Sequence, residues 1–185
     1  MAYPTQPAYI VTCAGWEERL KEHPVFDWMT DHEAAFDFGS AKTEPYTNWF
    51  TPDFTFADPS GASFTGEVAW AKLLETYAPL SAHFHEPFFG VVFENEKGYE
   101  LFGCAKIFAN LLVPGGGDKK TDGKGREWDV EVPGAFHFTY VKEEGAHKGL
   151  RLSAEKLYVD GLPMVSALLK RGMVSGEDLV KKLSA

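Results

Sequence analysis

The clearest alternation of apolar and polar positions falls within residues 49–80 and predicts a strand, a turn and a helix in succession. Phe54, Phe56 and Asp58 share one face of the strand, because successive side chains of a strand point to opposite sides. Residues 59–61 have turn chemistry, since proline fixes φ and glycine accepts a left-handed backbone. The strand is therefore predicted to end near Asp58, with a carboxylate beside two aromatic rings.

A helix is predicted after this turn. Thr65 suits the N-cap position, and Glu67 is an acidic residue in the first turn, where the helix dipole favours it. Apolar residues then recur with the spacing of one helical face: Trp70, Leu73, Leu74 and Tyr77. This spacing predicts a helix with one buried side.

Two further helices are predicted near the N-terminus. Residues 1–12 contain two prolines and are expected to form an arm, followed by a short helix at 16–21. Pro24 suits the first position of a longer helix that ends near Gly39. One apolar face of that helix carries Val25, Trp28, Met29, His32 and Phe36.

Strands are predicted over much of the second half of the chain. Residues 83–93 and 99–113 have the pattern of a long β-hairpin, with Pro87 at a bulge or bend. Two more strands are predicted within residues 127–141 and 149–160. After them, residues 163–183 are expected to form extra C-terminal helices, the last one capped by Ser175 and Asp178.

The glycine-rich segment 114–126 is predicted to be a polar, mobile hairpin tip. A phosphate-binding loop does not fit, because Lys124 is followed by Gly125 and not by Ser or Thr. A calcium loop does not fit either, because acidic residues do not recur at the required positions.

Composition narrows the class of protein. The 185 residues suit a single domain, taken as residues 13–185 after the arm, and a hydrophobic content of 44% with 15% aromatic residues suits a large core and an apolar cavity. A formal net charge of −9 disfavours nucleic acid and anionic membranes as partners. Cys13 and Cys104 have no spacing typical of a metal knuckle or a disulfide framework. No signal peptide or membrane span is predicted, so a soluble cytoplasmic protein is expected. No cofactor is expected.

The succession of strand, Asp-Pro-x-Gly turn and amphipathic helix resembles the nuclear-transport-factor-2-like superfamily. The resemblance implies a cone-shaped α+β fold, in which a curved mixed or antiparallel sheet of five or six strands wraps around N-terminal helices and encloses an apolar cavity. It also suggests a homodimer through the sheet face. The closest local match is ketosteroid isomerase, whose general-base aspartate opens such a turn, so the resemblance assigns that role to Asp58.

Two features depart from the ketosteroid isomerase pattern. The tyrosine that donates to the enolate oxygen in those enzymes is replaced by Phe36 and Phe38, unless His32 or Tyr46 substitutes for it. The protonated aspartate that supplies the second donor aligns with Phe136. Loss of both donors argues against steroid isomerisation by the usual route, because oxyanion stabilisation is the largest electrostatic contribution.

Histidines supply the other candidate chemistry. His83 and His85 lie on one strand face, and three interpretations stay open for them. They resemble a metal-binding pair of the cupin type, although Phe88 and Phe89 replace the expected glutamate. They also resemble the acid/base histidine of scytalone dehydratases and the pocket residues of SnoaL-like polyketide cyclases, or they lie exposed without a chemical role. For His32, both a core position and a catalytic role are open.

Two hypotheses of function follow. The first is a lyase, isomerase or cyclase that acts on a polyketide-, terpenoid- or steroid-like carbonyl compound, with Asp58 removing a proton and His83 or His85 donating one. The second is a non-catalytic module that binds an apolar ligand or assembles as a dimer, with Asp58 as a turn residue. The aromatic residues expected to contact a small apolar molecule are Trp28, Tyr46, Trp49, Phe54, Phe56, Trp70, Phe136, Phe138 and Tyr140.

Overall fold

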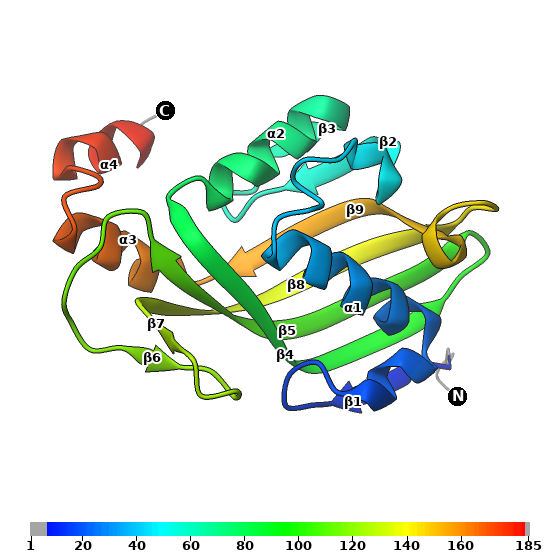
Figure 1. Ribbon diagram of the computed structural model, residues 1–185. Coiled ribbons are helices and arrows are strands. Elements are labelled where there is room, and N and C mark those ends of the chain that lie inside the picture. The colour runs from blue at the N-terminus through cyan, green and yellow to red at the C-terminus, as the bar shows by residue number, and fades with distance from the viewer. Residues whose placement is uncertain (1–6, 184–185) are drawn as a thin grey trace, which may run out of the picture.

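In the computed structural model, which describes residues 7–183, seven strands form one curved sheet around helix α1 (Figure 1). The order across the sheet is β1-β4-β5-β8-β9-β2-β3. Neighbouring strands are antiparallel except for β2 and β9, which run parallel. The strands are β1 (Tyr9–Thr12), β2 (Phe50–Ala57), β3 (Ser63–Thr65), β4 (Leu80–Glu94), β5 (Gly98–Leu111), β8 (Val130–Lys142) and β9 (Leu150–Val159).

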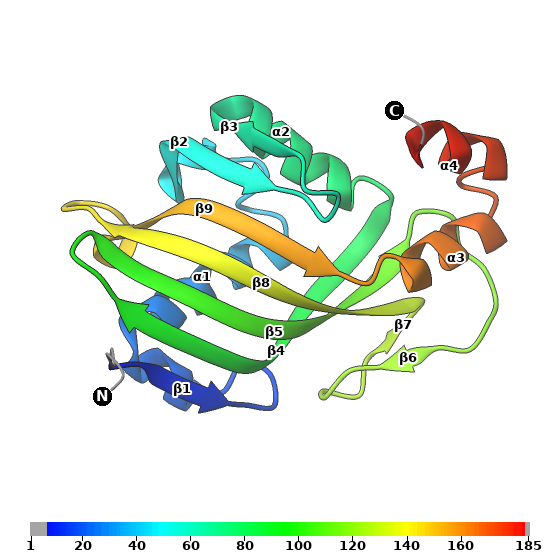
Figure 2. The same cartoon turned by 180° about the vertical axis from the view of Figure 1, so that it is seen from behind.

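Helices cover the concave face and one end of this sheet (Figures 1 and 2). Helix α1 lies across the concave face, and α2 lies over β2 and β3. The α-helices are α1 (Pro24–Asp37), α2 (Gly66–Tyr77), α3 (Leu162–Lys170) and α4 (Gly176–Leu183). Short 3-10 helices are η1 (Glu18–Glu22), η2 (Tyr46–Asn48) and η3 (His147–Gly149), and β6 (Lys120–Thr121) pairs with β7 (Glu127–Trp128).

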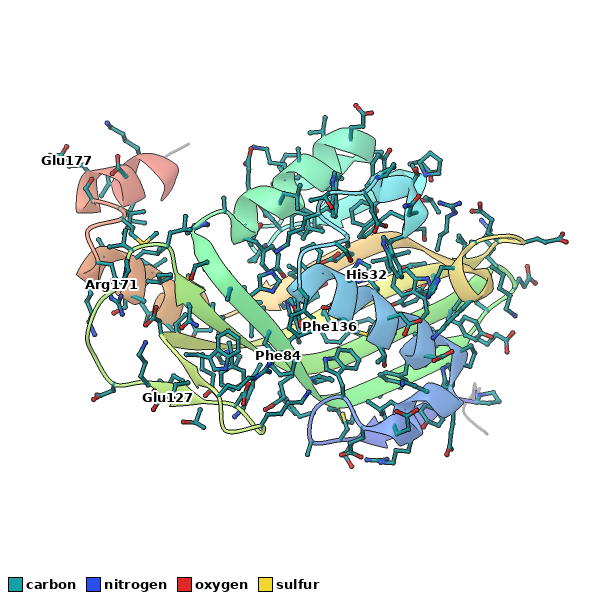
Figure 3. All side chains as sticks on the ribbon, in the orientation of Figure 1. His32, Phe84, Glu127, Phe136, Arg171 and Glu177 are labelled. Atoms are coloured by element: carbon teal, nitrogen blue, oxygen red, sulfur yellow. The ribbon has the colours of Figure 1, made fainter. Side chains whose placement is uncertain are left out.

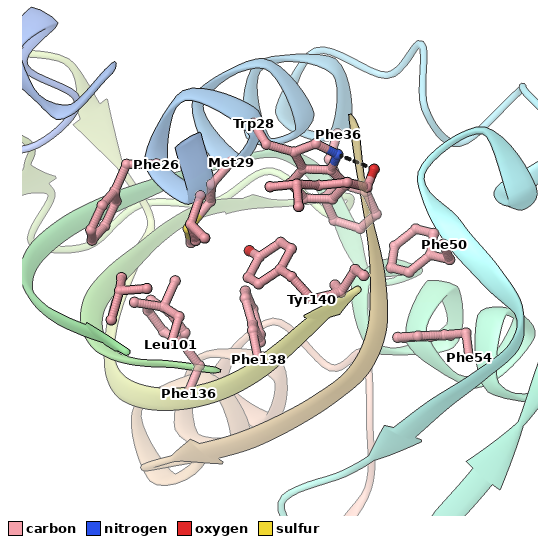
Figure 4. Packing of buried hydrophobic residues seen from close by; sticks show 14 of the residues in the cluster. Phe26, Trp28, Met29, Phe36, Phe50, Phe54, Leu101, Phe136, Phe138 and Tyr140 are labelled. Carbon is pink, nitrogen blue, oxygen red and sulfur yellow. Dashed lines mark hydrogen bonds between the residues drawn. The ribbon is translucent and has the colours of Figure 1, made fainter. Parts of the chain in front are cut away.

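The core lies between α1 and the sheet (Figure 4). Pro24 occupies the start of α1, and Nδ1 of His23 accepts a hydrogen bond from the Val25 backbone. The apolar face of the helix then meets Phe136, Phe138 and Tyr140 on β8. Nε1 of the fully buried Trp28 donates to the Leu150 carbonyl at 3.0 Å, which joins helix and sheet and satisfies the indole N–H.

The α+β class and the curved mixed sheet around α1 are confirmed. The predicted number of strands was too low, because the short edge strands β1 and β3 carry too few residues for a periodic pattern. Residues 9–12, predicted to belong to an arm, instead pair with β4. Residues 1–6 of that arm lie outside the described part of the chain.

Several local predictions are confirmed. The pairing of β4 with β5 shifts between Pro87 and Phe89, which is the predicted bulge. Ser175 and Asp178 cap α4 reciprocally, because Ser175 Oγ accepts from the Asp178 N–H and Asp178 Oδ2 accepts from the Ser175 N–H. Within segment 114–126, Asp122 accepts hydrogen bonds from the N–H groups of Lys124 and Arg126 in the β6–β7 turn. Among residues 7–183, no helix combines the length and the apolarity needed to cross a membrane.

Candidate active site

An apolar cavity lies between α1, α2 and the concave face of the sheet. Its volume, measured as the space open to the centre of a water molecule, is about 50 Å³, several times the roughly 10–15 Å³ that holds one water. Met29, Phe36, Leu73, Phe136 and Phe138 form much of its apolar wall. The polar groups that line it are His32, Glu33, Tyr77, His85 and Glu155.

His85 on β4 joins this cavity to a buried carboxylate on α1. Its Nδ1 lies 2.7 Å from Asp37 Oδ1, and its backbone N–H donates to Asp37 Oδ2 at 3.1 Å. Glu33, one turn earlier on α1, places Oε2 3.0 Å from the same Nδ1. On the other side of the ring, Nε2 lies 3.0 Å from the Tyr77 hydroxyl on α2. Side chains of α1 and α2 therefore fix the orientation of this imidazole.

The two carboxylates and His85 control one another's charge. Burial disfavours the imidazolium, but the Tyr77 oxygen and the carboxylates of Asp37 and Glu33 raise the pKa of His85 well above its usual value. Burial also opposes ionisation of Glu33 and Asp37, but the neighbouring His85 lowers the pKa of both carboxyls. His85 is therefore an imidazolium at neutral pH, held between two carboxylates.

His83 lies behind His85 and binds the same carboxylate. Its Nδ1 is 3.0 Å from Asp37 Oδ1, and its Nε2 contacts the Lys42 ammonium. Because an ammonium only donates, Nε2 of His83 accepts and Nδ1 carries the proton given to Asp37. Burial lowers the pKa of His83, in agreement with a neutral ring.

Asp37, His83 and His85 offer ligand atoms that lie within 4.8 Å of one another, a spacing that could hold a metal ion. Both Nδ1 atoms, however, already contact one carboxylate oxygen. Lys42 fixes the His83 proton on Nδ1, which removes the lone pair that a metal would need there. The arrangement favours acid/base chemistry over metal coordination.

Glu155 brings a second carboxyl group to the cavity from β9. Its exposed fraction is 6%, and no hydrogen bond from a described residue reaches its carboxyl oxygens. Burial, with a smaller contribution from the Glu33 charge, raises the pKa of Glu155 to about 8, although His85 opposes this rise. Nearby, His32 Nε2 and the Tyr140 hydroxyl are buried without a partner among the described residues, and Figure 4 shows that hydroxyl pointing toward Met29.

Comparison with solved structures identifies the architecture. A crystal structure of the Kfla4162 protein from Kribbella flavida superimposes with a TM-score of 0.56 at 17% identity, over 78% of this chain and 93% of that one. A putative scytalone dehydratase from Novosphingobium aromaticivorans gives a TM-score of 0.57 at 14% identity, over 77% of this chain and 85% of that one. The chain has the nuclear-transport-factor-2-like fold.

A third structure with this nuclear-transport-factor-2-like fold is the hexachlorocyclohexane dehydrochlorinase LinA-type3 from Novosphingobium barchaimii. It gives a TM-score of 0.53 at 10% identity, over 74% of this chain and 84% of that one. No protein-family model and no curated protein matches the sequence. The resemblance inferred from the turn and helix after β2 is thereby confirmed at the level of fold.

Asp58, the base suggested by the resemblance, does not line the cavity of this nuclear-transport-factor-2-like fold. Its Oδ1 accepts hydrogen bonds from the Ser60 N–H at 2.9 Å, the Ser60 hydroxyl at 2.6 Å and the Ala62 N–H at 3.1 Å. The carboxylate therefore organises the turn between β2 and β3. Turn chemistry, which the sequence offered as the alternative role, accounts for these contacts.

The other candidate residues divide into two groups. His32, His85, Phe136 and Phe138 line the cavity, and His32 and Phe136 are labelled in Figure 3. His83 supports His85 through Asp37. The remaining aromatic residues do not line the cavity, and they pack in or against the core: Trp28, Tyr46, Trp49, Phe54, Phe56, Trp70 and Tyr140. Within this second group, the Tyr46 hydroxyl donates to the Pro52 carbonyl and Trp49 packs edge-on against Trp28.

Four polar residues of the site were not predicted. Glu33 and Asp37 are one helical turn apart on α1 and follow Met29 at the same spacing, which is a sequence signal that acidic side chains continue the buried face. Tyr77 appeared only as part of the apolar face of α2. Glu155 had no signal in the periodic pattern of β9.

Proposed function

We propose that this chain is a cofactor-independent enzyme that transfers protons on an uncharged, largely apolar carbonyl compound, as a lyase, isomerase or cyclase. The observation that carries this proposal is His85, mostly buried at the cavity wall, with Nδ1 2.7 Å from Asp37 and Nε2 3.0 Å from Tyr77. A histidine held in this way is a typical acid/base group, because its partners fix both its charge and its orientation.

The contacts of His85 support the role of an acid for this residue. Its Nδ1–H is donated to Asp37 and Glu33, so Nε2–H points to the Tyr77 oxygen. The Tyr77 hydroxyl is then free to donate to an oxygen of a bound substrate. Such a donor stabilises negative charge that develops on a carbonyl oxygen or on a leaving oxygen, and it is most effective where water is excluded.

The side chains that line the cavity favour one class of substrate. Aromatic and aliphatic side chains favour an apolar molecule. Glu33 lines the cavity, and its carboxylate disfavours anions such as carboxylates and phosphates. Two of the similar structures are named as a putative dehydratase and a dehydrochlorinase. Both names describe elimination reactions, and they support a lyase in particular.

The proposal is tested with a panel of uncharged cyclic ketones and β-hydroxy ketones, incubated with the protein in D2O and followed by proton NMR. We expect deuterium incorporation next to the carbonyl group, or loss of water from the β-hydroxy ketones, well above the buffer rate. Alcohols of the same carbon skeleton provide the control. Binding of the ketones without exchange or elimination would contradict the enzyme and favour the non-catalytic ligand-binding module.

The outer face of the sheet supports a homodimer as the assembly of this enzyme. Strand register places Ile10, Val91, Phe102 and His137 in one row across the outer face. Figure 2 shows that no helix covers this face over β4, β5 and β8. Ile10 is 65% exposed, Phe102 45% and Tyr158 58%. Large exposed side chains of this kind mark interaction surfaces, and a sheet face pairs readily with its own copy.

Replacing Phe102 with lysine is expected to convert a dimer into a monomer, because a new charge would be buried at the centre of the contact between the two copies. Light scattering after size-exclusion chromatography measures the change. Phe38→Lys is the matched control, because Phe38 is 76% exposed at the end of α1 and lies away from the sheet face. A wild-type protein that is monomeric at high concentration would contradict the dimer.

A further inference from the structure

A β-bulge turns Glu155 toward the cavity. Along β9, Leu152 pairs with Tyr140 while Ala154 pairs with Thr139, so Ser153 is an extra residue opposite β8. Without this bulge, residues 150, 152 and 154 would share the inner face and Glu155 would point outward with Arg151. With it, Glu155 pairs with the inward-facing Phe138. Bulges often re-aim a side chain beside an active site.

No hydrogen bond or ion pair within the described residues accounts for the burial of the Glu155 carboxyl. The side chain is only 6% exposed, and no described residue donates a hydrogen bond to it. Buried carboxyl groups in proteins are normally hydrogen-bonded or paired, because an unpaired one costs free energy. An unpaired carboxyl that lines an apolar cavity therefore indicates a group kept available for a ligand.

We propose that Glu155 is a second catalytic residue, the general base that removes a proton from a carbon atom of the substrate while His85 and Tyr77 stabilise the substrate oxygen. This inference rests on the proposed function and extends it. It assigns the two halves of the proton transfer to different elements, the acid to β4 and α2 and the base to β9.

The step balances for a β-hydroxy ketone. The proton on the carbon next to the carbonyl moves to the Glu155 carboxylate, and the C–H electron pair forms the new C=C bond. The bond between the β-carbon and the hydroxyl oxygen breaks, and that oxygen takes a proton from His85 through Tyr77. The products are an unsaturated ketone and water. Transfer of the Glu155 proton back to His85 through the released water restores the starting charges.

The pH dependence follows from the groups around Glu155. Glu33 on α1, Tyr77 on α2, His85 on β4 and Tyr140 on β8 interact with it electrostatically. Burial and the Glu33 charge raise its pKa to about 8, so the basic form grows as pH rises toward that value. Activity should increase over the same range while His85 stays protonated.

The test uses 5-nitrobenzisoxazole, a flat, uncharged probe that opens to a coloured nitrophenolate when a base removes its single ring-carbon proton next to nitrogen. The C–H electron pair becomes part of a nitrile, and the N–O bond breaks to leave the phenolate. We expect the wild-type protein to accelerate this reaction, with a rate that rises up to about pH 8. Glu155→Gln should lower the rate by at least about 100-fold.

Glu131→Gln is the matched control, because Glu131 is a carboxylate on β8 that pairs with Lys106 and does not line the cavity. It should leave the rate unchanged. A Glu155→Gln protein that stays folded and as active as the wild type would overturn the assignment, as would a wild-type rate no higher than the rate in buffer alone. Either result would leave the proposed function intact, because that function is judged independently by the ketone panel and by His85.

Discussion

Replacing His85 with glutamine is expected to lower the rate of exchange or elimination on an active ketone by about 10²–10⁴-fold. Glutamine keeps a hydrogen-bonding group near Asp37 and Tyr77, but it has no acidic proton to transfer at neutral pH. The rate per protein molecule, measured by NMR at saturating ketone, tests this expectation. Circular dichroism before each measurement ensures that the variant is folded.

The matched control for His85 is His147→Gln. His147 also contacts a carboxylate, Asp31, but its side chain is 38% exposed and it does not line the cavity. This variant should retain the wild-type rate, because the change leaves the cavity untouched. An equal loss in both variants would show that the effect is structural, and full activity in His85→Gln would remove this residue from the mechanism.

The sequence predicted well those residues of the site that lie on regular strands. The alternation along β4 placed His83 and His85 on one face, and both contact Asp37. The same alternation placed Phe136 and Phe138 together, and both line the cavity. These predictions depend only on side chains that follow the backbone period, which holds as long as a strand is regular.

Irregular backbone and long-range pairing explain what could not be predicted. The alternation of side chains along β9 predicts Glu155 on the polar side of the strand, and only the bulge at Ser153 turns it inward. Asp37 is an ordinary acidic residue at a helix end until β4, 46 residues away along the chain, brings His83 to it. Asp58 had two consistent interpretations, and only the contacts of its carboxylate with Ser60 and Ala62 separate them.

Replacing Asp37 with asparagine is expected to lower the free energy of unfolding by about 3–5 kcal/mol, the cost of removing one partner from a buried ion pair. The Asp37 side chain is 2% exposed, and it binds the His83 ring, the His85 ring and the His85 backbone. Asparagine keeps the shape but leaves the buried imidazolium short of negative charge. Urea unfolding, followed by tryptophan fluorescence, measures the difference.

The sign of the pH dependence makes this prediction specific. Because the pKa of Asp37 is lowered from 3.8, its stabilisation is complete above that value and disappears as pH falls through the folded-state pKa. Because the pKa of His85 is raised above 6.5, its stabilisation is complete below 6.5 and disappears as pH rises through the folded-state pKa. The difference between wild type and Asp37→Asn should therefore be largest between pH 3.8 and 6.5.

Asp31→Asn provides the control on the same helix. Asp31 also pairs with a histidine and a lysine, His147 and Lys148, but its side chain is 38% exposed. Solvent screens that pair, so the variant should lose at most about 1 kcal/mol. Equal losses for Asp31→Asn and Asp37→Asn would contradict a buried charge network, because burial is what separates the two aspartates. A loss confined to Asp37 would locate the stabilising charge at the cavity wall, where the proposed acid is held.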